Sequence, residues 1–214
     1  MTEQLSATPL ILASASPRRQ ALIGRLGLPF LVAPSEVDET TVPGLAPEAV
    51  AQSLALLKAR AVATQYPGHV VIGADTVVIP YDDRPTILGK PRDDADAARM
   101  LRLLRDRWHR VATGIAVVRD DAEWCDVVSA GVRMGNYSDA DIAAYVASGE
   151  PHDKAGAYAA QGLGGRLVVE VRGSELTVVG LPLRRLAELL QEAEVTLPVD
   201  PTTIIDRWVI EGQR

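Results

Sequence analysis

The chain has 214 residues, of which 47% are hydrophobic and only 4% aromatic, and its formal net charge is −6 at pH 7. This length and apolar content predict a folded protein with one large domain or two closely packed lobes, whose core consists mainly of Ala, Val, Leu and Ile. The negative charge argues against general nucleic-acid binding, the single cysteine (Cys125) excludes an internal disulfide framework and a Cys-based zinc site, and no apolar run reaches the roughly 20 residues of a membrane span.

Targeting and metal-binding patterns are absent from the sequence. Residues 1–9 have neither the charged region nor the apolar region of a signal peptide, so we expect a cytoplasmic protein. The histidines His69, His109 and His152 lie far apart without metal-ligand spacing, and we interpret each as structural.

A predicted strand over residues 10–13 leads into a predicted helix whose start carries two arginines. Ser16 is a favoured N-cap and the proline that follows it suits the first helical position. Arg18 and Arg19 then fall in the first turn, where the helix dipole disfavours cations by about 0.3–1 kcal/mol each. Backbone N–H groups, the hydroxyls of Ser14 and Ser16, and two guanidinium groups together suit a phosphate or a carboxylate. The alternative is that the arginines reach solvent or a nearby acid.

Two acids and a lysine come next. A strand is expected over residues 28–33, and the polar segment after it contains the adjacent acids Asp38 and Glu39. Neighbouring residues of an extended chain point to opposite sides, so at most one of these acids would face a cleft. A helix is predicted over residues 47–65, and Lys58 lies at the edge of its apolar face, from which its ammonium either reaches solvent or enters a site.

The segment Val70–Val78 is predicted to be a core strand interrupted by one carboxylate, that of Asp75. Burying an ionised group costs several kcal/mol unless it is paired or solvated, so Asp75 is expected where the strand opens into a cleft. Gly73 agrees with this, because an isolated glycine in a strand indicates a bulge or a close backbone approach. The alternative is a strand-end aspartate that is hydrogen-bonded to neighbouring backbone.

The later elements are predicted from periodicity and turn residues. Residues 86–88 are expected to form a hairpin with the preceding strand and to end in a Gly-Lys-Pro corner that holds Lys90, without a P-loop pattern. The segment 153–162 is rich in small residues and carries Gln161, whose amide offers the donor and acceptor that base recognition requires; a tight structural loop is the alternative. We further expect strands over residues 109–118 and 123–133, a helix capped by Asp93 or Asp94, and a helix that begins at a capping box of Ser138 and Asp141. A hairpin of residues 167–171 and 176–179 and a last helix over residues 183–193 are expected to follow.

Motifs in the same order along the chain resemble the Maf family of nucleotide pyrophosphatases: LILASASPRRQALI, the pair Asp38 and Glu39, Lys58-Ala59, IGADTVV, GKP, HRVATG, SGEPHDKAGAYAAQG and VVGLPL. The resemblance implies one Maf-like domain over residues 1–193, followed by a C-terminal tail, residues 194–214, for which we predict no function. It also implies an elongated α/β fold with a mixed sheet, of the inosine-triphosphate-pyrophosphatase type, with a central nucleotide cleft between two lobes.

The resemblance further implies an activity and a set of site residues. A nucleoside triphosphate would be hydrolysed to the monophosphate and pyrophosphate with a divalent cation, Mg²⁺ or Mn²⁺. Asp75 matches the family's proton acceptor, and Glu39 matches its phosphate and metal region. Our hypothesis is that Asp75 either accepts the proton of the attacking water or holds the metal, with Glu39 as a second ligand of that metal. The positions that match its phosphate-binding and base-selecting residues are Ser14, Arg18, Arg19, Lys58, Thr76, Lys90 and Gln161.

The motifs GADT and DKAGAYxxQG resemble the branch of the family that acts on dTTP and UTP. We therefore expect a nucleotide as the partner, with no nucleic acid and no membrane, and a homodimer as an open alternative. Two other functions stay open: a nucleotide-binding regulator of septum formation without turnover, and the same chemistry on 7-methyl-GTP or another modified nucleotide. The loop before His109, the residue His152 and the long tail depart from the family's usual pattern.

Overall fold

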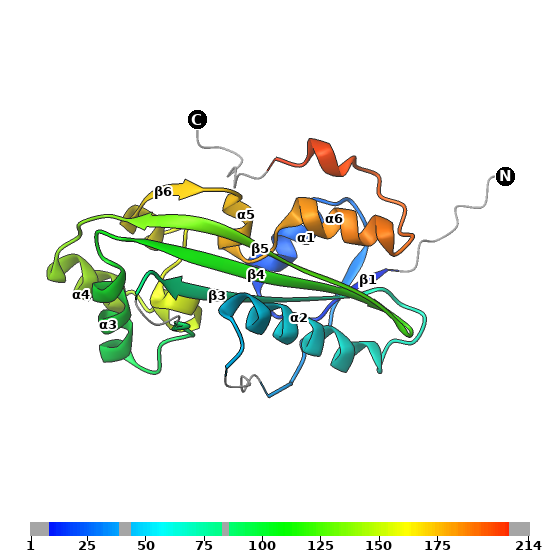
Figure 1. Cartoon of the computed structure of the whole chain (residues 1–214), viewed down its shortest axis with the longest axis horizontal. Coiled ribbons are helices and arrows are strands. Elements are labelled where there is room, and N and C mark those ends of the chain that lie inside the picture. Colours follow the sequence, from blue (N-terminus) through cyan, green and yellow to red (C-terminus); the bar gives the residue numbers. More distant parts are fainter. Residues whose placement is uncertain (1–8, 39–43, 83–85, 206–214) are drawn as a thin grey trace.

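The structure is a computed structural model that describes residues 9–38, 44–82 and 86–205 (Figure 1). Within these ranges, none of the helices combines the length and the apolarity of a membrane span. The predicted metal ligand Glu39 lies outside the described residues.

A six-stranded mixed sheet forms the centre of the molecule, in the order β2-β1-β3-β4-β5-β6. The strands β2, β1 and β3 are parallel, and β3, β4, β5 and β6 pair antiparallel. The long strands β3, β4 and β5 run along the length of an elongated molecule (Figure 1), which confirms the predicted mixed α/β class. The strands are β1 (Leu10–Leu12), β2 (Phe30–Val32), β3 (Val71–Pro80), β4 (Trp108–Arg119), β5 (Ala122–Met134) and β6 (Val168–Arg172).

Helices cover both faces of this sheet. Their bounds are α1 (Pro17–Gly24), α2 (Pro47–Ala63), α3 (Asp94–Leu104), α4 (Asp139–Ala147), α5 (Glu175–Val179) and α6 (Leu183–Glu192). Helix α2 lies on the face opposite to α1 and α6 (Figure 1). One hydrophobic cluster joins α1, α5 and α6 to the strands, and another joins α3 and α4 to the opposite end of the sheet. The molecule therefore has a separate apolar core toward each end.

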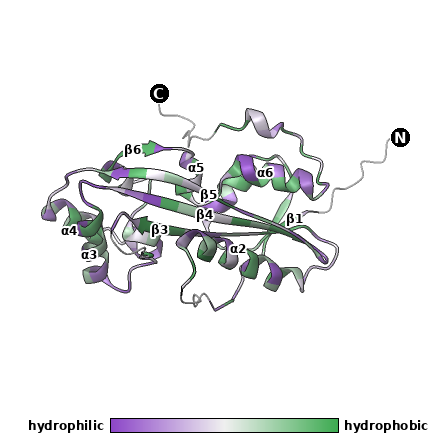
Figure 2. Ribbon diagram, in the orientation of Figure 1, coloured by the Kyte–Doolittle hydropathy of each residue, from purple (hydrophilic) through white to green (hydrophobic). Residues whose placement is uncertain are grey.

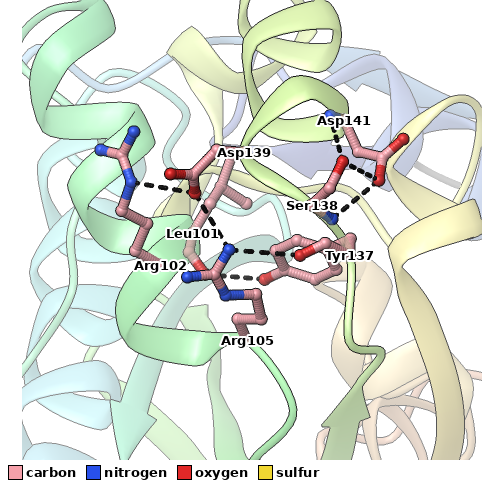
Figure 3. Close-up of polar contacts among 7 residues, drawn as sticks. All are labelled: Leu101, Arg102, Arg105, Tyr137, Ser138, Asp139 and Asp141. Carbon is pink, nitrogen blue, oxygen red and sulfur yellow. Dashed lines mark hydrogen bonds and ion pairs between the residues drawn. The ribbon is translucent and has the colours of Figure 1, made fainter.

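Helix α4 is fixed to α3 by polar contacts at the end of the sheet that carries both helices. Figure 3 shows Arg102 of α3 and Arg105, the residue that follows the helix, reaching the carboxylate of Asp139, with N···O distances of 3.3 and 2.9 Å. The hydroxyl of Tyr137 donates to the carbonyl of Leu101 at 2.7 Å. The predicted helix start at Ser138 is confirmed by a complete capping box with Asp141 (Figure 3).

Helix α2 packs directly on the backbone of β3 and β4. A Cβ atom at Gly73 would lie 2.1 Å from the carbonyl oxygen of Ala55, and one at Gly114 would lie 2.2 Å from that of Ala51. Because no side chain fits between them, glycine is required in both strands. Of the two explanations for Gly73, the close backbone approach is confirmed, whereas a bulge is wrong because the β3–β4 register is continuous there.

The strand β3 is buried along its length except for half-buried Thr76, and it is coloured as hydrophobic over most of that length in Figure 2. Its pairing with β1 reaches only to Ile72, and Leu88 forms a single bridge to Val78. Among the described residues, the edge of β3 between these two points faces no strand. Asp75 therefore lies where the sheet edge opens, as expected, whereas the predicted hairpin of residues 86–88 is reduced to one bridge.

The predicted hairpin of residues 167–171 and 176–179 is wrong in its second half. Residues 168–172 form β6, but residues 175–179 form the helix α5. The side chain of Ser174 accepts a hydrogen bond from the backbone of Thr177, and Gly180 ends the helix with a φ of 113°. These two caps outweigh the strand preference of the β-branched residues between them.

The beginning of the predicted tail packs against the first core. Four of its apolar side chains contact the hydrophobic cluster of α1 and α6: Val195, Leu197, Val199 and Ile204. The guanidinium of Arg184 donates to the carbonyl of Ile204 at 2.9 Å. The described part of the tail therefore covers apolar surface, while the domain boundary at residue 193 stays a prediction.

Candidate active site

A cavity of about 650 Å³ opens at the exposed edge of β3. Its walls come from the turn between β1 and α1, from α2, from β3, and from the loops around residues 89–90 and 153–161. This volume lies in the range of small-molecule sites in proteins. The cavity brings together every predicted site residue that the structure describes: Ser14, Arg18, Arg19, Lys58, Asp75, Thr76, Lys90 and Gln161.

Positive charge exceeds negative charge among the described residues that line this cavity, against the balance of the whole chain. The basic side chains are those of Arg18, Arg19, Lys58, Lys90 and Lys154, and the acidic ones are those of Asp75 and Asp153. Because the chain carries a net charge of −6, this local excess of cations favours an anionic ligand.

Lys58 and Asp75 form a buried ion pair in the lining of the cavity. The ammonium of Lys58 lies 2.6 Å from the Oδ1 atom of Asp75, and the two residues are 7% and 8% exposed. Lys58 therefore enters the site rather than reaching solvent, and Asp75 is paired by a side chain from α2. The close packing of α2 on Gly73 brings the two groups together. The ammonium stabilises the ionised carboxylate at this depth.

Arg19 is held by three neutral oxygen atoms from separate parts of the chain. Its Nε donates to the carbonyl of Gly180 at 2.8 Å, and its two terminal nitrogens donate to the hydroxyls of Ser14 at 3.3 Å and Thr76 at 3.2 Å. Ser16 caps α1, as predicted, and places Arg19 in the first helical turn. These three contacts fix the guanidinium on the cavity wall, where it can bind an anion.

Arg18 and Gln161 each present a buried nitrogen without a hydrogen-bond partner, Nε and Nε2 respectively. A buried donor left unpaired costs about 1–3 kcal/mol, which an acceptor on a ligand would recover. Burial lowers the pKa of Arg18, against the opposing effect of Asp153, Tyr145 and Glu150 nearby. Both side chains are therefore suited to contact a polar ligand.

Glu150 organises the loop that carries Gln161, a role that is not among those predicted from the sequence. One oxygen of its carboxylate accepts from the hydroxyl of Tyr145 and from the backbone of Gly164, both at 3.0 Å. The other oxygen accepts from the backbone of Leu163 at 3.2 Å. The hydroxyl of Tyr145 also accepts from the backbone of Ala159, on the other side of Gln161. In the sequence, the position of Glu150 within the motif SGEPHDKAGAYAAQG was the only indication of this role. Its backbone partners lie 13 and 14 residues further along the chain, so no local pattern links them to it.

The histidines outside the cavity wall make structural contacts, as interpreted from the sequence. His109 is fully buried and its Nε2 lies 2.7 Å from the hydroxyl of Tyr158, which lines the cavity. Burial lowers the pKa of His109 to about 4, so its ring is neutral at pH 7. The ring of His152 contacts the carbonyl of Gly149 at 3.0 Å and Asp94 at 2.7 Å; the first of these contacts raises its pKa most.

The oxygen donors of the cavity fit a hard divalent cation that shares its coordination with phosphate. Within the described ranges, no three His, Cys, Asp or Glu side chains cluster as metal ligands. Mg²⁺ is commonly bound by one or two carboxylates, with substrate phosphates and water completing its shell. The carboxylate of Asp75 can take that part, and Glu39 lies outside the described residues.

Comparisons with known proteins agree with the motifs. A family model described as "Maf-like protein" matches residues 9–193. The dTTP/UTP pyrophosphatase of Symbiobacterium thermophilum is 47% identical over 86% of this chain and 93% of its own, and that of Anaeromyxobacter dehalogenans strain 2CP-C is 48% identical over 90% and 97%. Among solved structures, the Staphylococcus aureus Ham1 protein aligns with 88% of this chain and 100% of its own, at 16% identity and a TM-score of 0.49. Because the family model spans most of the sequence and these relatives are nearly half identical to it, the chain belongs to the Maf family.

Proposed function

We propose that this protein is a nucleoside triphosphate pyrophosphatase that hydrolyses dTTP and UTP to the monophosphate and pyrophosphate. The observation that carries the proposal is the convergence of Arg18, Arg19, Lys58 and Lys90 with Asp75 in one cavity of an acidic chain. The relatives named dTTP/UTP pyrophosphatase support the choice of substrate.

Cleavage between the α and β phosphates requires an activated water, in-line positioning and neutralisation of the leaving pyrophosphate. The water oxygen forms a bond to phosphorus, the bond from phosphorus to the bridging oxygen breaks, and pyrophosphate leaves. In this proposal Asp75 either accepts the proton of that water or holds the cation that acidifies it. Lys58 holds the Asp75 carboxylate in place through their 2.6 Å contact.

The basic side chains would bind the triphosphate. Arg19, fixed by Gly180, Ser14 and Thr76, provides a rigid fork for phosphate oxygens. Lys90 is a further cation on the cavity wall. Because Arg19 is positioned before the substrate arrives, it can stabilise charge on the leaving group without a large rearrangement.

The proposed cofactor is Mg²⁺ or Mn²⁺, with Asp75 and Glu39 as its protein ligands. The bound cation would neutralise phosphate charge and lower the pKa of the attacking water. Base selection is proposed for Arg18, Thr76 and Gln161, which all line the cavity; Arg18 and Gln161 each also carry a buried nitrogen without a hydrogen-bond partner. A cytoplasmic location and a homodimeric state stay predictions.

A substrate panel tests this function directly. Purified protein is incubated with Mg²⁺ or Mn²⁺ and with dTTP, UTP, dCTP, GTP or 7-methyl-GTP, and both products are identified. We expect dTMP and pyrophosphate from dTTP, UMP and pyrophosphate from UTP, and slower release from the others. Release of dTDP and inorganic phosphate would contradict the cleavage site, preference for 7-methyl-GTP would contradict the substrate, and binding without release would favour the regulator.

A further inference from the structure

A chain of hydrogen bonds leads from Arg19 in the cavity to a buried threonine on β4. The guanidinium of Arg19 donates to Thr76 Oγ1 at 3.2 Å, Thr76 Oγ1 lies 2.9 Å from Thr113 Oγ1, and Thr113 Oγ1 donates to the carbonyl of Thr177 at 2.8 Å. Thr76 and Thr113 are directly opposite each other in the β3–β4 pair. The helix α5, which supplies this carbonyl, packs against both α1 and β4 (Figure 1).

The direction of these bonds follows from counting hydrogens, since each threonine hydroxyl has one hydrogen to donate. The carbonyl of Thr177 can only accept, so the hydrogen of Thr113 is committed to it. Thr113 Oγ1 must then accept from Thr76, which leaves the oxygen of Thr76 to accept from Arg19. Because Thr113 must donate to the Thr177 carbonyl, Thr76 must donate to Thr113, and the oxygen of Thr76 therefore accepts from the guanidinium of Arg19.

Thr113 is excluded from contact with the substrate by its place in the fold. It is fully buried, whereas Thr76 and Arg19 both line the cavity. The same end of α5 also supplies the Gly180 carbonyl that accepts from Arg19 Nε. Two backbone carbonyls at one helix end therefore orient the guanidinium, one directly and one through two hydroxyls.

We propose that Thr113 is a positioning residue for triphosphate binding, which acts through the hydroxyl of Thr76 to fix the guanidinium of Arg19. The proposal rests on the proposed function in that it takes the triphosphate to be the anion at Arg19. If the Thr113 hydroxyl is removed, the hydrogen of Thr76 loses its acceptor and competes with Arg19 for the space between them. Arg19 is then less well oriented. Of the three side chains proposed for base selection, Thr76 belongs to this hydrogen-bonded series, whereas Arg18 and Gln161 make none of its bonds.

The chain offers a matched control for this test. Thr177 is as fully buried as Thr113, but its own hydroxyl has no hydrogen-bond partner. The substitutions Thr113→Val and Thr177→Val therefore remove the same group from equally buried positions, and the second one keeps the backbone carbonyl of Thr177. Thr113→Ser restores a hydroxyl at the bridging position.

Two readouts are measured for each variant, well below its unfolding midpoint: kcat and KM for dTTP, and the Kd of pyrophosphate with Mg²⁺ by calorimetry. We expect Thr113→Val to lower kcat/KM and raise the Kd of pyrophosphate by about five- to tenfold, the loss of roughly one hydrogen bond. Thr177→Val and Thr113→Ser should stay within about twofold of the parent, since neither removes that bond. In a Thr76→Val background, Thr113→Val should have no further effect, because the hydrogen bond between the two hydroxyls is already absent.

Equal effects of Thr113→Val and Thr177→Val would overturn the proposal, as would additivity with Thr76→Val. A change in the relative kcat/KM values for dTTP, UTP and dCTP, with an unchanged Kd of pyrophosphate, would also overturn the proposal. That result would mean that these hydrogen bonds act in base selection. The proposed function and the proposed role of Thr113 can be contradicted independently. If the parent protein releases no pyrophosphate from dTTP, the proposed function fails, whereas the calorimetric comparison still decides the role of Thr113.

Discussion

The ammonium of Lys58 lies 2.6 Å from the carboxylate of Asp75, and only 9% and 11% of the two side chains is exposed. One residue comes from α2 and the other from β3, and the glycine contact between these elements fixes their separation. Each charge stabilises the other at this depth, because bulk water reaches neither side chain fully. The pair is thus part of the fold as well as of the candidate active site.

Replacing Lys58 tests this dependence. We expect Lys58→Met to lower the free energy of unfolding by about 3–5 kcal/mol, because it leaves the Asp75 carboxylate buried without its cation. The double variant Lys58→Met/Asp75→Asn should recover much of this loss but no activity toward dTTP. Urea unfolding measures the stability of both. A single variant as stable as the parent would show that the pair does not hold the two elements together.

The packing of α2 against the sheet gives a second prediction. Gly73→Ala places a Cβ atom 2.1 Å from the carbonyl of Ala55, so the helix must move away from β3 and take Lys58 with it. We expect a loss of about 1–3 kcal/mol in unfolding free energy, together with reduced turnover of dTTP. Gly24→Ala is the control, because the added Cβ would have no contact closer than 4.0 Å. Equal stability of the two variants would contradict the close packing.

The Glu150 carboxylate is expected to control base preference through the loop that carries Gln161. In Glu150→Gln one acceptor oxygen becomes a donor amide, which faces backbone N–H groups of the loop. We expect the preference for dTTP over dCTP to fall by about five- to tenfold, with a smaller change in the affinity for pyrophosphate. Glu170→Gln, on exposed β6, is the matched control. An unchanged preference in Glu150→Gln would remove this residue from substrate selection.

Buried His109 predicts a specific pH dependence of stability. Its pKa is about 4 in the folded protein and about 6.5 when unfolded, so between these values the unfolded chain binds a proton that the folded protein excludes. Stability therefore falls as the pH drops from 6.5 to 4, by about 1 kcal/mol per pH unit, and the contribution is constant below pH 4. His109→Gln removes this titration, so urea unfolding at several pH values should show a steeper loss in the parent. Parallel curves would contradict a neutral buried ring.

The sequence predicted most elements and the residues around the cavity because each carries a local signal. Ser16 followed by proline marks the start of α1, and a carboxylate within an apolar strand marks Asp75. The environment of Lys58 stayed undecided, because a position at the edge of a helical stripe does not show what packs against it. Thr113 and Glu150 were given no role, since their importance depends on partners elsewhere in the sequence: Thr76, 37 residues away, and the loop at Gly164, 14 residues away. Helix α5 was mistaken for a strand because its two caps compete with β-branched residues between them.

The most direct test of the central claim is the rate of pyrophosphate release from dTTP by Asp75→Asn. Asparagine keeps the shape of the side chain and an oxygen that accepts from Lys58, so the variant should fold, with an unfolding midpoint lowered by the loss of the buried ion pair. Because it removes the charge and the proton acceptor, we expect turnover to fall by about 10²–10⁴. A folded variant that releases pyrophosphate at the parent rate would show that Asp75 does not carry the chemistry, and the account of this site would be wrong.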